Sequence, residues 1–242
     1  MRLYYFTSQR YGIEAIKNTR LKISRFSQLN DTSELRINVK NYSDKQEQQN
    51  QFEAFDQQGG ILCMTANWPD TRMWGHYADN HKGMALIFDA DPEYWFPILY
   101  VSDRLRTEAF GKNRYRDLTV RDHFGIGMTK SDKWEYENEV RRYLPLDDCE
   151  QVGEMHFSSF ELAKVSFIGA LFGARTTMSS DDLEYMKKEG HKVGFMKQSD
   201  NDFGIVLDSE KTNGHVNQVT FNDLYKDVVD EGTSGNFTQS WH

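Results

Sequence analysis

The chain has 242 residues, a formal net charge of −8 at pH 7 and two cysteines, Cys63 and Cys149, that lie far apart. This length allows a complete hydrophobic core, and the cysteine number excludes a disulfide scaffold or a zinc site built on C-x-x-C pairs. The acidic balance excludes a surface that binds phosphate backbones over its whole extent, so a nucleic acid partner would need a local basic patch.

Short strand patterns dominate the chain, and few long helical periods occur. Alternating or continuous apolar runs predict strands, and apolar residues at spacings near 3.6 predict helices. In chain order the patterns are strand 2–8, helix 11–19, strand 20–26, turn 27–35, exposed helix or loop 40–60, strand 60–68, helix 70–83, strand 84–91, strand 98–103, basic segment 104–123, strand 133–146, strand 164–172 and helix 179–190. The segments 203–209 and 215–229 follow without an assigned element. Strands outnumber helices, so the predicted fold class is α+β.

The helix at 179–190 has the clearest boundaries. Ser180 is expected to cap it, aspartates follow in its first turn, lysines lie in its last turn, and Gly190 ends it. No proline-rich linker divides the chain, so we predict one α+β domain over residues 1–230. The polar sequence EGTSGNFTQSWH at 231–242 predicts a disordered tail.

The sequence KWEYENEVRRYLPL at 133–146 contains an unusual charge pattern. On a strand, every second side chain points to the same face. Glu135, Glu137 and Glu139 would therefore form one row, with Arg141 next. Carboxylates at that spacing repel unless cations, hydrogen bonds or water compensate. The pattern has two interpretations, a solvated edge strand or a cleft that needs two carboxylates.

A cluster of aromatic and histidine residues occurs within MWGHYADNHKG. Metal binding on one helix face needs histidines three or four positions apart, whereas His76 and His81 are five apart. We therefore predict no metal site, and expect the segment to support the sheet. No G-x-G-x-x-G, P-loop or G-x-S-x-G pattern occurs, which leaves Rossmann, P-loop and common serine-hydrolase sites without support.

Three motifs, in this order, resemble an uncharacterised bacterial and phage family catalogued as a domain of unknown function. The matching positions are Asn30, Asp31 and Glu34; then Trp74, Tyr77, Ala78, His81 and Gly83; then Trp134, Glu137, Glu139 and Arg141. Thr32 departs from the proline that is frequent in the family, which puts the local turn in doubt. The resemblance spans about residues 3–175 and by itself implies no chemistry.

The order of elements also resembles ADP-ribosyltransferases, more distantly. These enzymes hold NAD in a cleft between two small sheets, with an aromatic or basic residue on the first strand, a Ser or Thr on a middle strand and Glu-x-Glu on a late strand. The resemblance implies NAD as substrate, and a pocket formed by Tyr4, Tyr5, Thr7 and Thr65. It implies catalytic roles for Glu139, beside the ribose, and Glu137, at the acceptor. Arg141 would offset their repulsion or hold a phosphate.

The same resemblance implies a macromolecular acceptor, either nucleic acid or protein. It also implies a role as a toxin or phage-defence effector, with an antitoxin or inhibitor protein as a partner. Arg114 and Arg116, in the basic segment, are candidates for binding the acceptor, although a solvated loop that pairs with the many acidic residues explains them slightly better. Two alternatives stay open. One is a non-enzymatic binding or inhibitory protein, and the other is a Mg²⁺-dependent nuclease that uses the carboxylates.

The compartment follows from two absences in the sequence. The N-terminal MRLYYFTSQR has no long apolar run, and no stretch approaches the roughly 20 apolar residues that span a bilayer. We expect a cytoplasmic protein without membrane contact.

Overall fold

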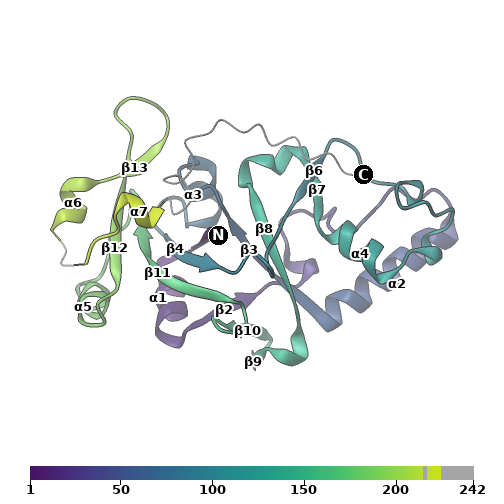
Figure 1. Cartoon of the computed structure of the whole chain (residues 1–242), viewed down its shortest axis with the longest axis horizontal. Helices are drawn as coiled ribbons and strands as arrows, with labels where there is room; N and C mark the ends of the chain where they lie inside the picture. The colour runs from purple at the N-terminus through teal and green to yellow at the C-terminus, as the bar shows by residue number, and fades with distance from the viewer. Residues whose placement is uncertain (215–216, 225–242) are drawn as a thin grey trace.

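The computed structural model describes residues 1–214 and 217–224 as a mixed α and β fold (Figure 1). The strands are β1 Arg2–Thr7, β2 Arg20–Ile23, β3 Gly59–Thr65, β4 Met84–Ala90, β5 Phe96–Pro97, β6 Leu99–Val101, β7 Thr129–Ser131, β8 Glu139–Pro145, β9 Glu150–Val152, β10 Met155–Ser159, β11 Val165–Phe172, β12 Lys192–Gln198 and β13 Ile205–Leu207. The helices are α1 Gln9–Asn18, α2 Tyr42–Gln58, α3 Thr71–Tyr77, α4 Val120–Gly127, α5 Ser180–Lys188, α6 Ser209–Asn213 and α7 Phe221–Leu224. Short 3-10 helices occur at Phe26–Gln28, Thr107–Phe110, Tyr115–Asp117, Asp132–Glu137 and Leu146–Asp148.

The main sheet has eight strands in the order β13-β12-β11-β4-β1-β3-β8-β5. Strand β1 pairs with β4 along its whole length, but it pairs with β3 only at Tyr4 and Thr65. Beyond this point β1 and β3 have no further paired residues, whereas β3 continues in register with β8. The sheet therefore consists of a five-strand part and a three-strand part joined at a single residue pair.

Two smaller sheets accompany the main one. Strands β2, β10 and β9 form an antiparallel sheet, and β6 and β7 form a parallel pair. A bridge between Ser24 and Ile61 connects the end of β2 to β3. The predicted α+β class is confirmed, but the strands are arranged in one divided eight-stranded sheet with two small additions, not in two small sheets. Strand β12, which sequence analysis did not predict, extends the sheet beyond β11.

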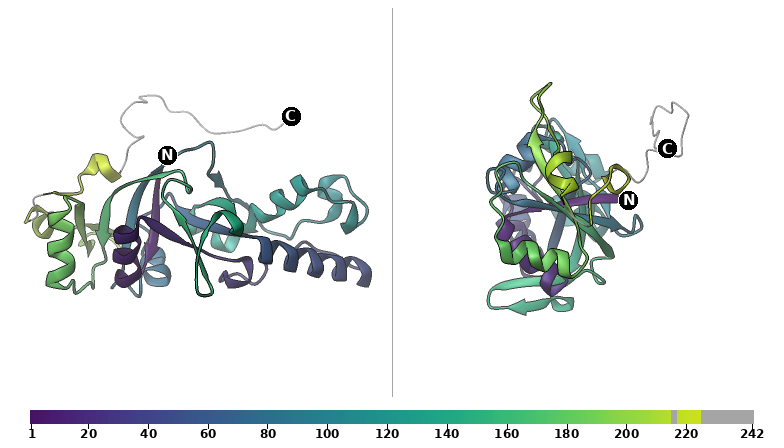
Figure 2. Two further views of the ribbon diagram at one scale, coloured as in Figure 1. Left: turned by 90° about the horizontal axis from the view of Figure 1, so that it is seen from below. Right: turned by 90° about the vertical axis from the view of Figure 1, so that its left-hand side faces the viewer.

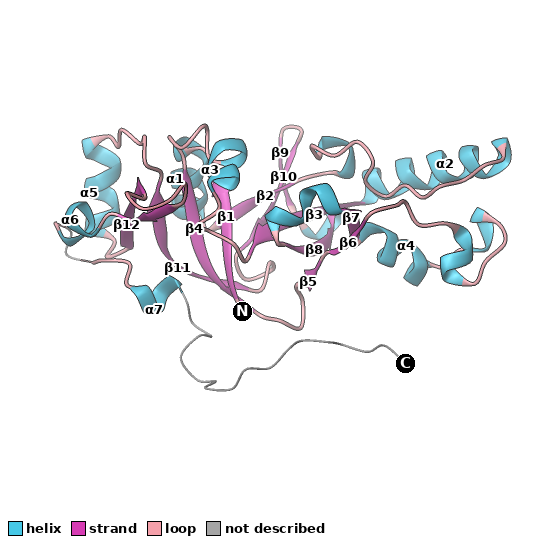
Figure 3. Cartoon of the chain, turned by 90° about the horizontal axis from the view of Figure 1, so that it is seen from above, coloured by secondary structure: helices cyan, strands magenta, loops and turns pink. Residues whose placement is uncertain are grey.

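Apolar side chains pack on both faces of the main sheet. Leu86 and Phe88 of β4 belong to the core that α1 and α5 cover, whereas Ala85 and Ile87 belong to the core with Trp74 of α3. All four of these β4 side chains are fully buried, as expected for a central strand with an almost continuous apolar sequence. Helices α2 and α4 extend from one end of the molecule, beyond the end of the main sheet (Figures 2 and 3).

The predicted strand at 133–146 is wrong in its first half. Asp132–Glu137 form a 3-10 helix that Ser131 caps, and only Glu139–Pro145 form β8. Between them Asn138 adopts a left-handed conformation with φ of 41°, which asparagine tolerates better than most residues. Glu135 is exposed, so the row of three glutamates does not exist.

Two further boundaries differ from the sequence expectations. Ser179, not Ser180, caps α5 by accepting a hydrogen bond from the Asp182 N–H group. The predicted tail at 231–242 lies outside the described residues. No helix among those that the structure describes combines the length and apolar character needed to cross a membrane.

Candidate functional site

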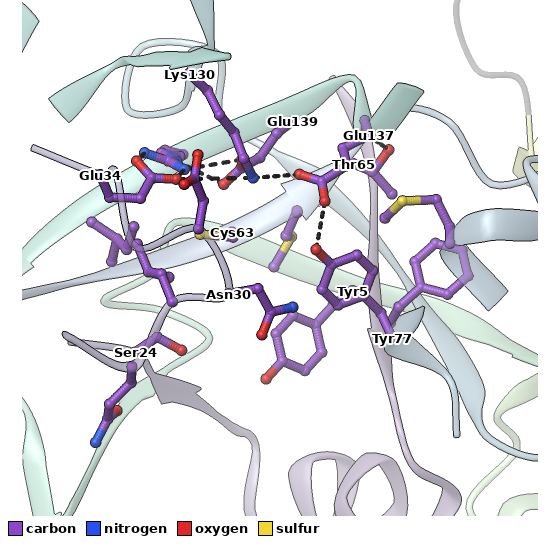
Figure 4. A pocket seen from close by; sticks show the side chains of 18 of the residues that line it. Tyr5, Ser24, Asn30, Glu34, Cys63, Thr65, Tyr77, Lys130, Glu137 and Glu139 are labelled. Carbon is purple, nitrogen blue, oxygen red and sulfur yellow. Dashed lines mark hydrogen bonds and ion pairs between the residues drawn. The ribbon is translucent and has the colours of Figure 1, made fainter. Parts of the chain in front are cut away.

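A cavity of about 260 Å³ opens where β1 and β3 part (Figure 4). Its walls come from both parts of the main sheet, since β1 contributes Tyr5 and Phe6, β3 contributes Cys63, and β8 contributes Glu139 and Arg141. The segment after β2, helix α3, strand β7 and the 3-10 helix at 132–137 complete it. The division of the sheet therefore creates the cavity.

Arg141 is fully buried at the base of this cavity, and all five of its N–H donors are used. Its guanidinium donates to Glu34 at 2.6 and 2.8 Å and to Glu139 at 2.7 and 3.1 Å. The fifth bond, of 2.8 Å, goes to the carbonyl oxygen of Gly127 at the end of α4. One side chain thus fixes two carboxylates that lie 105 residues apart in the sequence.

Lys130 supplies the second buried cation. Its Nζ atom lies 2.5 Å from Glu137 and 3.0 Å from Glu139, and 3.9 Å from Glu34. The other oxygen of Glu137 accepts a hydrogen bond from the Tyr77 hydroxyl. Three carboxylates and two cations meet here, so the cluster has a formal charge of −1 when all five groups are ionised. We refer to Glu34, Lys130, Glu137, Glu139 and Arg141 as the charge cluster.

The charges set the ionisation of this cluster. Burial by itself raises the pKa of Glu139, but the neighbouring Arg141 and Lys130 outweigh it and lower that pKa to about 2. Burial lowers the pKa of Lys130, and the carboxylates of Glu139 and Glu137 reverse this and raise it. For Glu34, burial is the stronger effect and its pKa is raised despite Arg141. Glu139 and Lys130 therefore stay charged over the physiological range.

Neutral hydroxyl and thiol groups line the rest of the cavity. Burial raises the pKa of Tyr5 to about 12, and burial together with the hydrogen bond to Glu137 raises that of Tyr77. Burial and the charge of Glu139 raise the pKa of Cys63 well above its usual value. These groups offer hydrogen bonds and an aromatic surface but no nucleophilic anion at neutral pH.

The structure brings together several site residues predicted from the sequence. The cavity is lined by the predicted residues Tyr5, Asn30, Asp31, Glu34, Thr65, Tyr77, Glu137, Glu139 and Arg141. Thr65 has a second role, because its hydroxyl donates to the Glu137 carbonyl and accepts from the Asn67 N–H group. It thereby ties the 3-10 helix to β3.

Other predicted residues lie elsewhere or act differently. Tyr4 also borders the cavity, but its side chain is 1% exposed in the core with Trp74 and its hydroxyl donates to the Leu224 carbonyl. Tyr5, which is less buried, is therefore better placed to contact a ligand. Trp74 is fully buried and its indole N–H donates to the Trp68 carbonyl. His81 is half-buried with φ of 69°, and its carbonyl accepts a hydrogen bond from the Arg175 N–H group.

The two arginines predicted to bind the acceptor lie outside this cavity's lining. Arg114 pairs with Asp44 of α2 at 3.5 Å, and Arg116 is exposed on the 3-10 helix at 115–117. Both belong to the part of the chain next to α2 and α4. Thr7 lines a different cavity, which shares Tyr5 with the first one.

The carboxylates do not form a divalent metal site in this arrangement. Among the residues that the structure describes, no group of three His, Cys, Asp or Glu side chains is arranged to hold a metal ion. The Lys130 ammonium lies between Glu137 and Glu139, in the place where a cation would bind to both. The protein thus supplies its own cation to these carboxylates.

Lys130 is the main site residue that sequence analysis missed. It lies in a three-residue strand with the sequence Thr-Lys-Ser, which has no pattern that distinguishes a buried lysine from a solvated one. Its burial is imposed by the pairing of β7 with β6 and by the position of β8. Cys63 was noted only for its separation from Cys149, although it lies on a predicted strand, which the structure shows as β3.

Comparison of the chain with models of protein families and with curated proteins finds no match, and neither does comparison with solved structures. The chemical capacity of the site is therefore judged from its geometry. A fixed, negatively charged wall beside tyrosine hydroxyls is suited to stabilising positive charge on a bound ligand.

Proposed function

We propose that the protein is an NAD-dependent ADP-ribosyltransferase that modifies a macromolecular acceptor, and that it acts as a toxin or phage-defence effector. The observation that carries the proposal is a row across three neighbouring strands. Tyr4, Thr65 and Glu139 are directly paired on β1, β3 and β8, at the one point where the two parts of the sheet are joined. The cavity begins at this row and contains both carboxylates of the Glu-x-Glu sequence.

The proposed chemistry uses the charge of the cluster. Breaking the bond between nicotinamide and ribose develops positive charge on the ribose, and a preorganised carboxylate stabilises that charge without reorganisation. Glu139 keeps its charge, since its pKa is about 2, and Arg141 fixes its orientation through two hydrogen bonds. We assign Glu139 to the ribose.

Glu137 is assigned to the acceptor. Its carboxylate is held between the Tyr77 hydroxyl and the Lys130 ammonium. Movement of Lys130 away from it would expose an oxygen able to accept a proton from the attacking group. Tyr5 presents an aromatic ring and a neutral hydroxyl to the ligand, which suits stacking on a planar nicotinamide ring.

One observation favours a second candidate, a non-enzymatic binding or inhibitory protein. Every carboxylate in the charge cluster already has at least one protein cation as a partner, as expected for a structural ion network. In such a protein Glu139 and Arg141 would fix the shape of the cavity, and no bond would be broken. Release of nicotinamide from NAD separates the two candidates.

The test uses NAD labelled in its adenylate part, incubated with purified protein and either cellular nucleic acid or cellular protein. Glu139→Gln is expected to lower kcat by about 10²–10³ with a smaller change in NAD affinity, because its charge acts mainly in the transition state. Glu137→Gln is expected to impair transfer more than NAD hydrolysis. Glu135→Gln is the matched control, since Glu135 is exposed in the same segment.

Stability must be measured in parallel, because Glu139 is paired with two buried cations and its neutralisation is expected to lower Tm. Activity is therefore compared well below the Tm of each variant. Absence of both nicotinamide release and label transfer in folded wild-type protein would reject the transferase in favour of the binding protein. Equal activity of wild type and Glu139→Gln would reject the assignment of Glu139.

A further inference from the structure

A second cavity lies beside the first and shares two wall residues with it. It measures about 190 Å³, and Tyr5 and Lys22 line both cavities. Its other lining residues come from α1, β2 and β10 and from Thr7 of β1, and none of them is a member of the charge cluster. The two cavities are thus neighbours, with Tyr5 and Lys22 at their common boundary.

The second cavity has an aromatic and cationic wall. Phe157 of β10 is directly opposite Lys22 of β2, so the two side chains are on the same face of the small sheet. The Arg20 guanidinium lies 4.2 Å from the centre of the Phe157 ring, and its Nη1 atom is anchored by Glu150 at 2.6 Å. Tyr11 of α1 also lines this cavity and is 59% exposed.

The contrast between the two compartments indicates the chemistry of the ligand. The first cavity combines Tyr5 with buried carboxylates, which suits a cationic ring or a ring attached to a sugar that becomes cationic. The second cavity offers Tyr11 and Phe157 for stacking of an aromatic base, which any base can exploit through its π-face. At the boundary, Lys22 is exposed and has no ion pair with a carboxylate within residues 1–214 and 217–224.

We propose that the second cavity binds the adenosine half of a dinucleotide whose nicotinamide half occupies the first, with Lys22 facing the pyrophosphate between them. The inference rests on the proposed function, and it adds a binding site formed by Tyr11, Lys22 and Phe157. An ammonium group at the junction of two ring-binding compartments fits an anionic linker, because it pairs with phosphate charge without demanding one fixed geometry. Glu14 of α1 also lines the second cavity and is placed to accept hydrogen bonds from ribose hydroxyls or an exocyclic amine.

The test is calorimetric titration of the full chain with ADP-ribose, NAD and nicotinamide mononucleotide. Tyr11→Ala is expected to weaken ADP-ribose and NAD binding about tenfold, the loss typical of one stacked base, and to leave nicotinamide mononucleotide binding unchanged. Lys22→Gln is expected to weaken all three ligands several-fold and to reduce the salt dependence of binding.

Matched controls come from α2, which lies away from both cavities. Tyr42 is 81% exposed and Lys45 is exposed, so Tyr42→Ala and Lys45→Gln remove the same groups without touching a cavity wall. Both are expected to bind all three ligands as wild type does. Since Tyr11 and Lys22 are also exposed, their replacement is expected to leave Tm within the range of the controls.

The outcomes separate this inference from the proposed function. If Tyr11→Ala selectively loses ADP-ribose while wild type releases no nicotinamide from NAD, the second cavity stands and the transferase is rejected. If wild type cleaves NAD and both Tyr11→Ala and Lys22→Gln retain its KM for NAD, the second cavity is rejected and the transferase stands. Failure of wild-type protein to bind ADP-ribose at millimolar concentration also overturns the inference.

Discussion

Replacement of Arg141 by methionine probes the charge cluster most directly. Methionine keeps an unbranched apolar stem of similar reach but removes all five N–H donors. Glu34 and Glu139 would each lose two hydrogen bonds, and the Gly127 carbonyl would lose its Arg141 partner. Both carboxylates are at most 6% exposed, so little solvent reaches the oxygen atoms that would lose their donors.

The expected loss follows from this geometry. Removing one partner of a buried ion pair typically costs 3–5 kcal/mol, because a charge is left without compensation. Lys130 remains near both carboxylates and offsets part of this, so we expect Arg141→Met to lower the free energy of unfolding by about 3 kcal/mol or more. A domain is usually stable by only about 5–15 kcal/mol. The variant should therefore unfold at a clearly lower urea concentration.

Arg142 provides the matched control on the same strand. It is also buried, but its guanidinium donates a hydrogen bond of 2.8 Å to the Leu162 carbonyl and lies over the Tyr94 ring. Arg142→Met leaves no buried carboxylate behind, so we expect a loss of about 1–2 kcal/mol. The difference between the two variants isolates the contribution of the orphaned carboxylates.

The pH dependence of Arg141→Met supplies the refutation. Without the guanidinium, we expect the pKa of Glu34, which burial already raises in the wild type, to rise further. We expect the folded-state pKa of Glu139 to rise as well, because one of the two cations that lower it is gone. A raised carboxyl pKa contributes stability at low pH that is lost as pH rises. The destabilisation relative to wild type should thus be smaller at pH 5 than at pH 7.5 in urea titrations followed by circular dichroism. A loss below about 1 kcal/mol, or one that is the same at both pH values, refutes the reasoning.

Three more predictions concern stability. The folded-state pKa of Glu139 is about 2 against an ordinary 4.5, so the stability that this group contributes is present above pH 4.5 and is lost as pH falls. In urea titrations at pH 6 and pH 3.5, the free energy of unfolding of the wild type should fall by about 1 kcal/mol more than that of Glu139→Gln. Gly83→Ala places a Cβ atom 2.2 Å from the Thr7 carbonyl oxygen, and we expect it to lower the free energy of unfolding by about 1–3 kcal/mol. The added Cβ atom of the control Gly75→Ala has no neighbour closer than 3.9 Å, so this variant should be neutral or stabilising. Equal Tm values for the two variants would contradict this prediction. Thr65→Val removes the hydroxyl that donates a hydrogen bond to the Glu137 carbonyl. We expect the free energy of unfolding to fall by about 1–3 kcal/mol and the amide hydrogens of residues 132–138 to exchange faster. Unchanged exchange would argue against the anchoring role of Thr65.

Local sequence patterns predicted the central strands and the helices α1, α3 and α5, but not β5, β7, β9, β10, β12 or α4. The strands β1, β3, β4 and β11 were predicted because apolar continuity and period-two alternation are properties of neighbouring residues. The segment before β8 was predicted wrongly for the same reason. Its glutamates have the spacing of a strand face, and the sequence contains no sign that a 3-10 helix ends at a left-handed Asn138.

The candidate site follows a similar division. The sequence by itself determined the candidate residues of the site by their type and order. Of these, Tyr5, Thr65, Glu137 and Glu139 all line the cavity. Only the tertiary structure decided that β1 and β3 part after a single paired position, which creates that cavity. Which cations compensate the carboxylates was also decided at that level. Contacts such as Glu34 with Arg141 join residues 107 positions apart, and pairing over such distances depends on strand order and register, which no local pattern contains.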